Sequence, residues 1–165
     1  METLWAPWRM EYILGEKEEE GCIFCLKPQQ DTDHKNLIIY RGKHCFIILN
    51  YYPYNNGHLM IVPFRHICAL SQLRREEKVE IMNLIEVATV IIEDDMAAQG
   101  FNIGANIGKI AGAGIDQHLH FHVVPRWNGD TNFMPVTGHT KVIPEALEQI
   151  ADRLRALFMK KLGSA

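Results

Sequence analysis

Histidine recurs at every second position in the segment 117–124, whose sequence is QHLHFHVV. Side chains on a β-strand point to alternate faces, so this spacing separates the histidines from the apolar residues, which face the core. The histidines are His118, His120 and His122, and the apolar residues are Leu119, Phe121 and Val123. Such imidazoles stand about 6 to 7 Å apart and do not readily converge on one metal ion. Because imidazole is nucleophilic near neutral pH, the row favours covalent transfer of a group to nitrogen; a histidine-rich exposed face is the alternative.

Length, composition and charge indicate a single globular domain over residues 1–165. The chain has 165 residues, of which 47% are hydrophobic and 22% are charged, and about 150 residues per domain is common. A net charge of −3 does not fit a protein that binds nucleic acid polymers, so we expect a small anionic partner. Charged residues interrupt the apolar residues of segment 1–20, which argues against a signal peptide, and we expect a cytoplasmic protein without a membrane span.

Hydrophobic periodicity predicts an α+β fold with a mainly antiparallel sheet. Strands are expected at residues 37–40, 45–49, 59–62, 101–107 and 119–124, the last ended by Pro125, with a loop at 108–114. Val79, Met82, Ile85, Val90 and Ile92 recur with roughly helical period, which predicts a long helix over residues 76–98 that Gly100 ends. A second helix is expected from Pro144 to about residue 162, and residues 1–20 are expected to form an N-terminal arm.

Cys22 and Cys25 are two residues apart, a spacing that supplies half of a tetrahedral zinc site. The pair alone is a weak signal, and a reduced pair without metal is the alternative. The two other cysteines, Cys45 and Cys68, lie in apolar runs and are expected in the core.

The segment from His118 to Val124 resembles the motif of the histidine triad (HIT) superfamily, in which three histidines alternate with apolar residues. Residues 48–50, Pro53 and the segment 57–66 resemble the first half of the same family in order and spacing, so the resemblance covers about residues 21–127. The segments 4–10, 102–108, 126–127 and 130–133 resemble the bacterial and archaeal branch that is similar to diadenosine tetraphosphate phosphorylases. The resemblance implies a HIT-like fold and an enzyme that acts at the α-phosphate of an adenine nucleotide.

The resemblance assigns roles to individual residues. His120 would be the nucleophile that forms a nucleotidyl-imidazole intermediate, and His122 would contact the α-phosphate. Asn50 would contact the ribose, Ile48 would lie beside the base, and Asn106 would face the phosphates. Water or inorganic phosphate would then open the intermediate, with a dinucleoside polyphosphate as the substrate.

The loop before the motif departs from the family. Many hydrolases of this family carry Gln and then Ser or Thr there, whereas this chain has the sequence GAGI at residues 112–115. This difference argues against a nucleoside phosphoramidate hydrolase, which we keep as an alternative, and it leaves open a non-catalytic, zinc-stabilised nucleotide-binding module. Backbone N–H groups at Gly112 and Gly114 would bind phosphate instead, and Gln117 is a further nucleotide-binding candidate.

The resemblance also completes the metal site and implies an assembly. In zinc-bearing members the remaining ligands correspond to His66 and His118, which would make a closed, structural Cys2His2 site with Cys22 and Cys25. His58 is interpreted as structural. A homodimer is implied, with the long helix and an adjoining strand at its interface.

Overall fold

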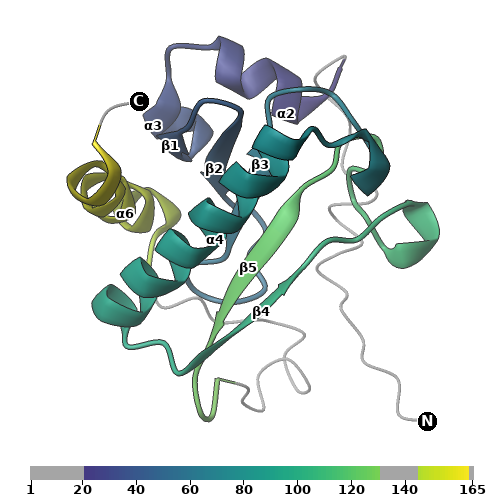
Figure 1. Cartoon of the computed structure of the whole chain (residues 1–165). Helices are drawn as coiled ribbons and strands as arrows, with labels where there is room; N and C mark the ends of the chain where they lie inside the picture. Colours follow the sequence, from purple (N-terminus) through teal and green to yellow (C-terminus); the bar gives the residue numbers. More distant parts are fainter. Residues whose placement is uncertain (1–20, 131–144, 164–165) are drawn as a thin grey trace, which may run out of the picture.

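The computed structural model describes residues 21–130 and 145–163 (Figure 1). The predicted arm 1–20, the segment 131–133 and the helix start at Pro144 lie outside these residues. The helical elements are α2 Ile23–Leu26, η1 Lys27–Gln29, α3 Asp33–Asn36, η2 Leu70–Gln72, α4 Arg75–Met96, η3 Lys109–Ala111 and α6 Leu147–Leu162. The strands are β1 Ile38–Arg41, β2 Cys45–Leu49, β3 Leu59–Pro63, β4 Gly100–Gly104 and β5 Phe121–Arg126.

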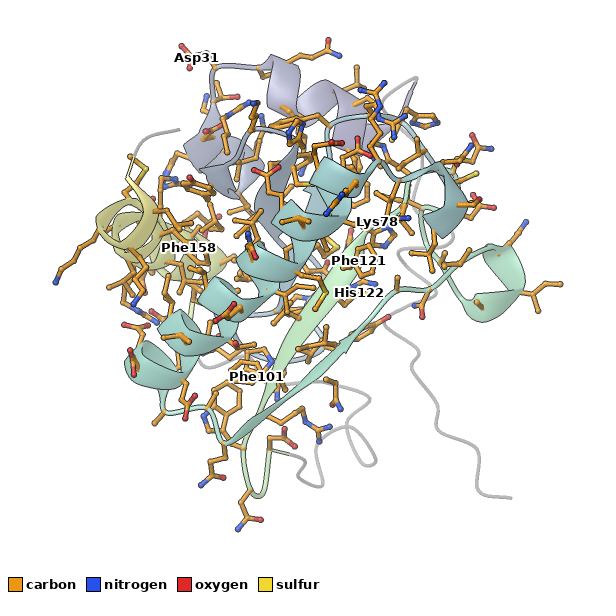
Figure 2. The ribbon with its side chains drawn as sticks, viewed as in Figure 1. Asp31, Lys78, Phe101, Phe121, His122 and Phe158 are labelled. Atoms are coloured by element: carbon orange, nitrogen blue, oxygen red, sulfur yellow. The ribbon has the colours of Figure 1, made fainter. Side chains whose placement is uncertain are left out.

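The strands form one sheet in the order β1-β2-β3-β5-β4, and every pairing is antiparallel. The expected α+β class and antiparallel sheet are therefore confirmed. All residues of β2 and β3 are buried because both faces of the sheet are covered. On one face α4 and α6 pack against residues such as Ile47 and Ile61, and Phe158 of α6 stacks on Tyr40 at 6.3 Å (Figure 2). On the other face Phe24 of α2 packs with its neighbours in a smaller core.

Strand β5 differs from the expected strand at both ends. It begins at Phe121, because the backbone N–H of Leu119 donates to the carbonyl of Ile67, 2.6 Å away, rather than to β3. The strand also continues through Pro125, whose carbonyl accepts from Asn55 Nδ2 at 3.0 Å, on the side away from β4. The nitrogen of Pro125 faces the same side of β5 as its carbonyl, towards β3. Because β5 pairs with β3 through residues 121–123, the missing N–H of Pro125 removes no hydrogen bond between strands. The predicted termination at Pro125 was wrong.

The long helix is present, but part of the expected apolar face was wrong. Three of the five periodic residues, Val79, Met82 and Val90, are 53%, 63% and 39% exposed. The buried residues of α4 are Glu77, Ile81, Leu84, Ile85, Ala88, Ile91 and Ile92. Apolar residues occupy more than one side of this helix, so periodicity alone does not select the buried side. The helix ends at Met96, followed by the capping residue Ala97 in the left-handed conformation with φ of 51°, and Gly100 begins β4 instead.

An ion pair with a buried carboxylate connects the start of α4 to the segment after β3. The carboxylate of Glu77 accepts hydrogen bonds from Arg65 Nε at 2.6 Å and Nη2 at 2.7 Å, and from the backbone N–H of Arg74 at 2.7 Å. Its side chain is 3% exposed, whereas that of Arg65 is 35% exposed. The hydrogen bonds from Arg65 lower the pKa of Glu77 to about 2. Glu77 therefore stabilises the fold in its charged form.

We expect Glu77→Gln to lower the free energy of unfolding at pH 7 by about 2 to 3 kcal/mol, allowing for the partial exposure of Arg65. The lowered pKa means that the contribution of Glu77 is complete above about pH 4.5 and is lost as the pH falls towards 2. Urea titrations of both proteins from pH 7 to pH 3 would measure it. The stability difference should shrink below pH 4.5, and a difference independent of pH would contradict this account.

Candidate active site

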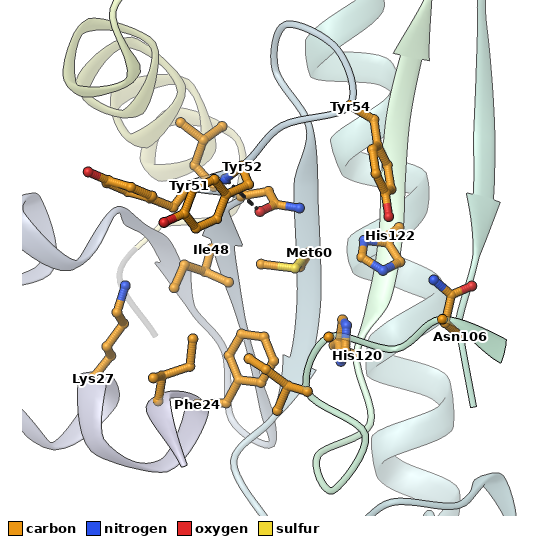
Figure 3. Close-up of a pocket in the computed structure, with 16 residues that line it drawn as sticks. Phe24, Lys27, Ile48, Tyr51, Tyr52, Tyr54, Met60, Asn106, His120 and His122 are labelled. Carbon is orange, nitrogen blue, oxygen red and sulfur yellow. Dashed lines mark hydrogen bonds between the residues drawn. The ribbon is translucent and has the colours of Figure 1, made fainter. Parts of the chain in front are cut away.

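A pocket opens between the sheet and α2 (Figure 3). It is lined by Ile23, Phe24, Lys27, Ile48, Leu49, Asn50, Tyr51, Tyr52, Tyr54, Met60, Asn106, Gly112, Gly114, Ile115, His120 and His122. Both predicted catalytic histidines and five of the six predicted nucleotide-binding residues are therefore brought together here, and Gln117 is the one outside the lining. In Figure 3 His120, His122 and Asn106 lie at one end, while Ile48, Phe24 and Lys27 lie towards the other. The pocket thus joins a polar end to a largely apolar one.

His120 is held in the tautomer that a nucleophile requires. Its Nδ1 lies 2.8 Å from the carbonyl of His118, and because a carbonyl only accepts, Nδ1 carries the hydrogen. The lone pair is then on Nε2, and the residue lines the pocket. The side chain packs against Phe24 with ring centroids 5.1 Å apart, and burial lowers the pKa of His120. The imidazole is accordingly neutral, and nucleophilic, at neutral pH.

His122 is oriented by His58, which the sequence analysis treated as structural. His58 is fully buried, and its Nδ1 accepts the backbone N–H of Tyr54 at 3.0 Å. The hydrogen on its Nε2 therefore points to Nδ1 of His122, 2.9 Å away. Nδ1 of His122 is then an acceptor, so its Nε2 carries the hydrogen and can donate a hydrogen bond to a phosphate oxygen. This chain of three residues fixes a hydrogen-bond donor beside His120.

The register of the sheet brings these histidines together. His122 lies in β5 opposite Met60 of β3, and His58 precedes β3 by one residue. The rings of His120 and His122 are 4.9 Å apart, closer than the predicted spacing of strand residues, because His120 precedes the regular strand. A sequence signal for His58 existed in its position just before an apolar run, but the pairing of two strands distant in sequence was needed to interpret it.

The glycine loop offers less to a phosphate than expected. Gly112 has φ of +84°, and its backbone N–H donates to the carbonyl of Lys109 at 3.0 Å, so this group is engaged within the loop. The predicted phosphate contact through the Gly112 N–H is therefore not available in this conformation. Gly114 lines the pocket, and Asn106 brings a side-chain amide to the same end (Figure 3).

Cys22, Cys25, His66 and His118 form a compact cluster beside the pocket. Their four ligating atoms lie within 4.8 Å of one another. Nδ1 of His118 is 3.3 Å from the Cys22 sulfur and 3.6 Å from that of Cys25, which is itself 3.3 Å from Nδ1 of His66. Ligands of a tetrahedral zinc ion lie about 3.3 to 3.8 Å apart, given bonds of about 2.0 to 2.3 Å. The predicted ligand set is thus assembled with spacing that suits zinc.

The surroundings of the cluster also fit a metal. Nε2 of His118 lies 2.9 Å from the carbonyl of Pro63, so Nδ1 faces the two sulfurs without a hydrogen, as ligation requires. Burial and the neighbouring Cys22 raise the pKa of Cys25 to about 11, so a bound cation would be needed to hold both thiolates. Of the other cysteines, Cys45 is buried as expected, whereas Cys68 is exposed, contrary to expectation.

Comparison with known proteins gives consistent matches. A model of the HIT domain family matches residues 31–129. The AP-4-A phosphorylase of Mycobacterium tuberculosis is 39% identical over 154 residues, which cover 89% of this chain and 79% of that protein. The solved structure of a zinc-bound histidine triad family protein from Mycobacterium smegmatis has a TM-score of 0.69 at 26% identity, over 86% of this chain and 95% of that one. The diadenosine triphosphate hydrolase of Plasmodium falciparum has the same fold, with a TM-score of 0.63 at 19% identity, over 94% and 96% of the two chains.

Proposed function

Because this chain belongs to the HIT domain family, we propose that it is an enzyme that transfers a nucleotidyl group from a dinucleoside polyphosphate, with His120 as the nucleophile. The observation that carries this proposal is the placement of His120, with its lone pair on Nε2, at the polar end of a pocket whose other end is largely apolar. A base would occupy the apolar end beside Ile48 and Phe24, which leaves the α-phosphate next to His120.

The first step would form a bond between Nε2 of His120 and the α-phosphorus. The bond from phosphorus to the bridging oxygen breaks, and its electron pair leaves with that oxygen. From diadenosine tetraphosphate the products are ATP and an adenylyl group on His120. The N–H of His122 would stabilise the charge on the phosphoryl oxygens, because His58 holds it in a fixed direction.

In the second step an acceptor would attack the adenylyl group and release His120. Inorganic phosphate would give ADP, and water would give AMP. We favour phosphate as the acceptor, because the relative that shares 39% of its residues is a phosphorylase by name. A covalent intermediate suits either acceptor, since it divides one displacement into two easier steps.

Product analysis with and without inorganic phosphate tests this function. Purified protein is incubated with diadenosine tetraphosphate, and the nucleotides are separated by anion-exchange chromatography. We expect ADP and ATP in the presence of phosphate, and no AMP. Release of AMP and ATP independent of phosphate would identify a hydrolase instead, and no consumption of substrate in either condition would contradict the proposed enzyme.

Two alternative functions predict different results in the same assays. A nucleoside phosphoramidate hydrolase would turn over an adenosine phosphoramidate faster than the dinucleotide, and the glycine loop at residues 112–115 argues against it. A non-catalytic nucleotide-binding module would bind these nucleotides and convert none. The geometry around His120 favours catalysis, because a binding protein has no need of an unprotonated Nε2 at the polar end of its pocket.

We propose that the Cys2His2 cluster holds a structural zinc ion. Four protein ligands fill a tetrahedral site, so the ion would supply rigidity rather than take part in the reaction. The cluster would join α2 to the segments after β3 and before β5. Because thiolate ligands persist in reducing compartments, this site fits a cytoplasmic protein. Within the described residues, no helix combines the length and apolarity needed to cross a membrane.

We also propose a homodimer formed through α4 and β4. Val79, Met82 and Val90 lie on one side of α4, where a monomer leaves them exposed. β4 ends the sheet order among the described strands, and its Ile103 is 49% exposed. Burial of these side chains against a second copy would remove their apolar surface from water.

Met82→Glu is expected to convert the dimer into a monomer, because each copy would bring an uncompensated charge into the shared apolar surface. Sedimentation velocity at several protein concentrations measures the change. Met159→Glu is the matched control, since Met159 is 42% exposed on α6, a helix outside the proposed interface, and should leave the dimer intact. A dimer that persists in Met82→Glu would place the interface elsewhere.

A further inference from the structure

Tyr54 presents a hydroxyl group to the catalytic histidines. It lies in the loop between β2 and β3 and lines the pocket. Its ring stacks on His58 with centroids 5.0 Å apart and an interplanar angle of 20°, and it lies 5.9 Å from the ring of His122. Figure 3 shows the phenolic oxygen pointing towards His122. Because its backbone N–H also binds His58, Tyr54 is held at both its ring and its backbone.

A hydrogen-bond donor at the leaving group would favour the reaction, and no side chain of the glycine loop 112–115 can act as one. When the bond to the bridging oxygen breaks, negative charge develops on the leaving polyphosphate, and a fixed hydrogen-bond donor there lowers the barrier. Residues 112–115 have no polar side chain, and the Gly112 N–H is already engaged by Lys109. Asn106 and Tyr54, whose side chains line the pocket and can donate, are therefore candidates for that donor.

The position of Tyr54 suits the leaving group better than the base. In Figure 3 Tyr51 and Tyr52 lie above Ile48, towards the apolar end, whereas Tyr54 lies above His122, on the opposite side of that ring from His120 and Asn106. A nucleotide with its base near Ile48 and its α-phosphate between His120 and His122 would place its leaving polyphosphate beside Tyr54 if the polyphosphate runs past His122. Its hydroxyl can donate one hydrogen bond to an anionic oxygen there.

We propose that Tyr54 is a further catalytic residue, whose hydroxyl donates a hydrogen bond to the leaving polyphosphate as the bond between the α-phosphorus and the bridging oxygen breaks. This inference rests on the proposed function. No proton is transferred in the step: the electron pair stays on the bridging oxygen of the departing ATP, and Tyr54 keeps its hydrogen while it stabilises the charge.

Tyr54→Phe removes the hydroxyl and retains the ring that stacks on His58. The measurement is the rate of the first turnover without phosphate, for two substrates that transfer the same adenylyl group. One is diadenosine tetraphosphate, and the other is the p-nitrophenyl ester of AMP, whose phenolate leaving group carries no phosphate. We expect ATP release to slow by about 100-fold or more, as for loss of one fixed donor. Nitrophenol release should slow by less than about threefold, because delocalisation already stabilises that leaving group.

The two substrates separate catalysis from structural support. An equal loss on both would show that Tyr54 acts through His58 and His122, and an unchanged rate of ATP release would show that the hydroxyl is not used; either result overturns the proposal. Tyr40→Phe, which removes a hydroxyl from a partly buried ring that stacks on Phe158, should leave both rates unchanged. A wild-type protein that cleaves neither substrate would overturn the proposed function itself, and with it this inference.

Discussion

His120→Ala is expected to slow the release of ATP from diadenosine tetraphosphate by about 10⁴-fold or more, because it removes the atom that forms the covalent bond in the proposed mechanism. The lone pair on Nε2 of His120 is set by the hydrogen bond from Nδ1 to the carbonyl of His118. In the described residues His122 is the other triad histidine in the pocket, but its Nδ1 is engaged by His58, and its Nε2 carries a hydrogen. It therefore cannot replace His120 as the nucleophile. Quench-flow chromatography of the first turnover measures the loss.

A second measurement separates catalysis from folding. His120 is 5% exposed, so the variant leaves a small cavity, and its circular dichroism and Tm must be compared with the wild type. Wild-type protein incubated with labelled diadenosine tetraphosphate without phosphate should carry an acid-labile, alkali-stable adenylyl group, and His120→Ala should carry none. His34→Ala is the matched control, because this side chain is 60% exposed and pairs with Asp152. A folded His120→Ala protein with wild-type turnover would exclude the mechanism.

Much of the sheet could be predicted because its strands are short apolar runs with clear boundaries. Residues 45–49 coincide with β2, and residues 59–62 lie within β3. The alternation of histidine and apolar residues also correctly separated Leu119 and Val123, which are buried in the core beneath α4, from His120, which lines the pocket. These features depend on the local chain, so the sequence contains the information they need.

Features that depend on contacts between distant segments were not predicted. The bond between His58 and His122 requires the register of β3 against β5, which the sequence does not specify. The buried side of α4 depends on which of its apolar sides meets the sheet, and Val79 and Met82 show that the periodicity was compatible with either. Gly112 illustrates a third limit. The glycine-rich loop around it suits phosphate binding, but its backbone N–H donates to the carbonyl of Lys109 within a turn.

Cys22→Ser is expected to abolish stoichiometric zinc binding and to lower the free energy of unfolding by an amount on the order of 5 kcal/mol. The cluster joins segments before α2, after β3 and before β5, so its loss frees several parts of the fold at once. It also reaches the active site through His118. Nδ1 of that residue faces the sulfurs, its Nε2 binds the carbonyl of Pro63, and its own carbonyl orients His120.

Catalysis should therefore decline together with zinc content, although no zinc ligand enters the pocket. When His118 is no longer fixed by the metal, the carbonyl that holds Nδ1 of His120 becomes mobile, and fewer molecules present Nε2 correctly. We expect Cys22→Ser, assayed below its Tm, to keep the KM of the wild type within about threefold and to lose about 10-fold or more in kcat. Prolonged incubation of the wild type with a strong chelator should reproduce both changes, and added zinc should reverse them in the wild type only.

Cys68→Ser supplies the matched control for this experiment. Cys68 is exposed, and it lies outside the cluster, so the same loss of sulfur there should change neither zinc content nor Tm. Elemental analysis by mass spectrometry gives the zinc content, and calorimetry gives Tm with and without chelator. If purified wild-type protein contains no zinc and its Tm matches that of Cys22→Ser, the four residues are a reduced thiol and imidazole cluster without metal. The hydrogen bond from His118 to Pro63 would then be the remaining contact that orients the His118 carbonyl towards Nδ1 of His120.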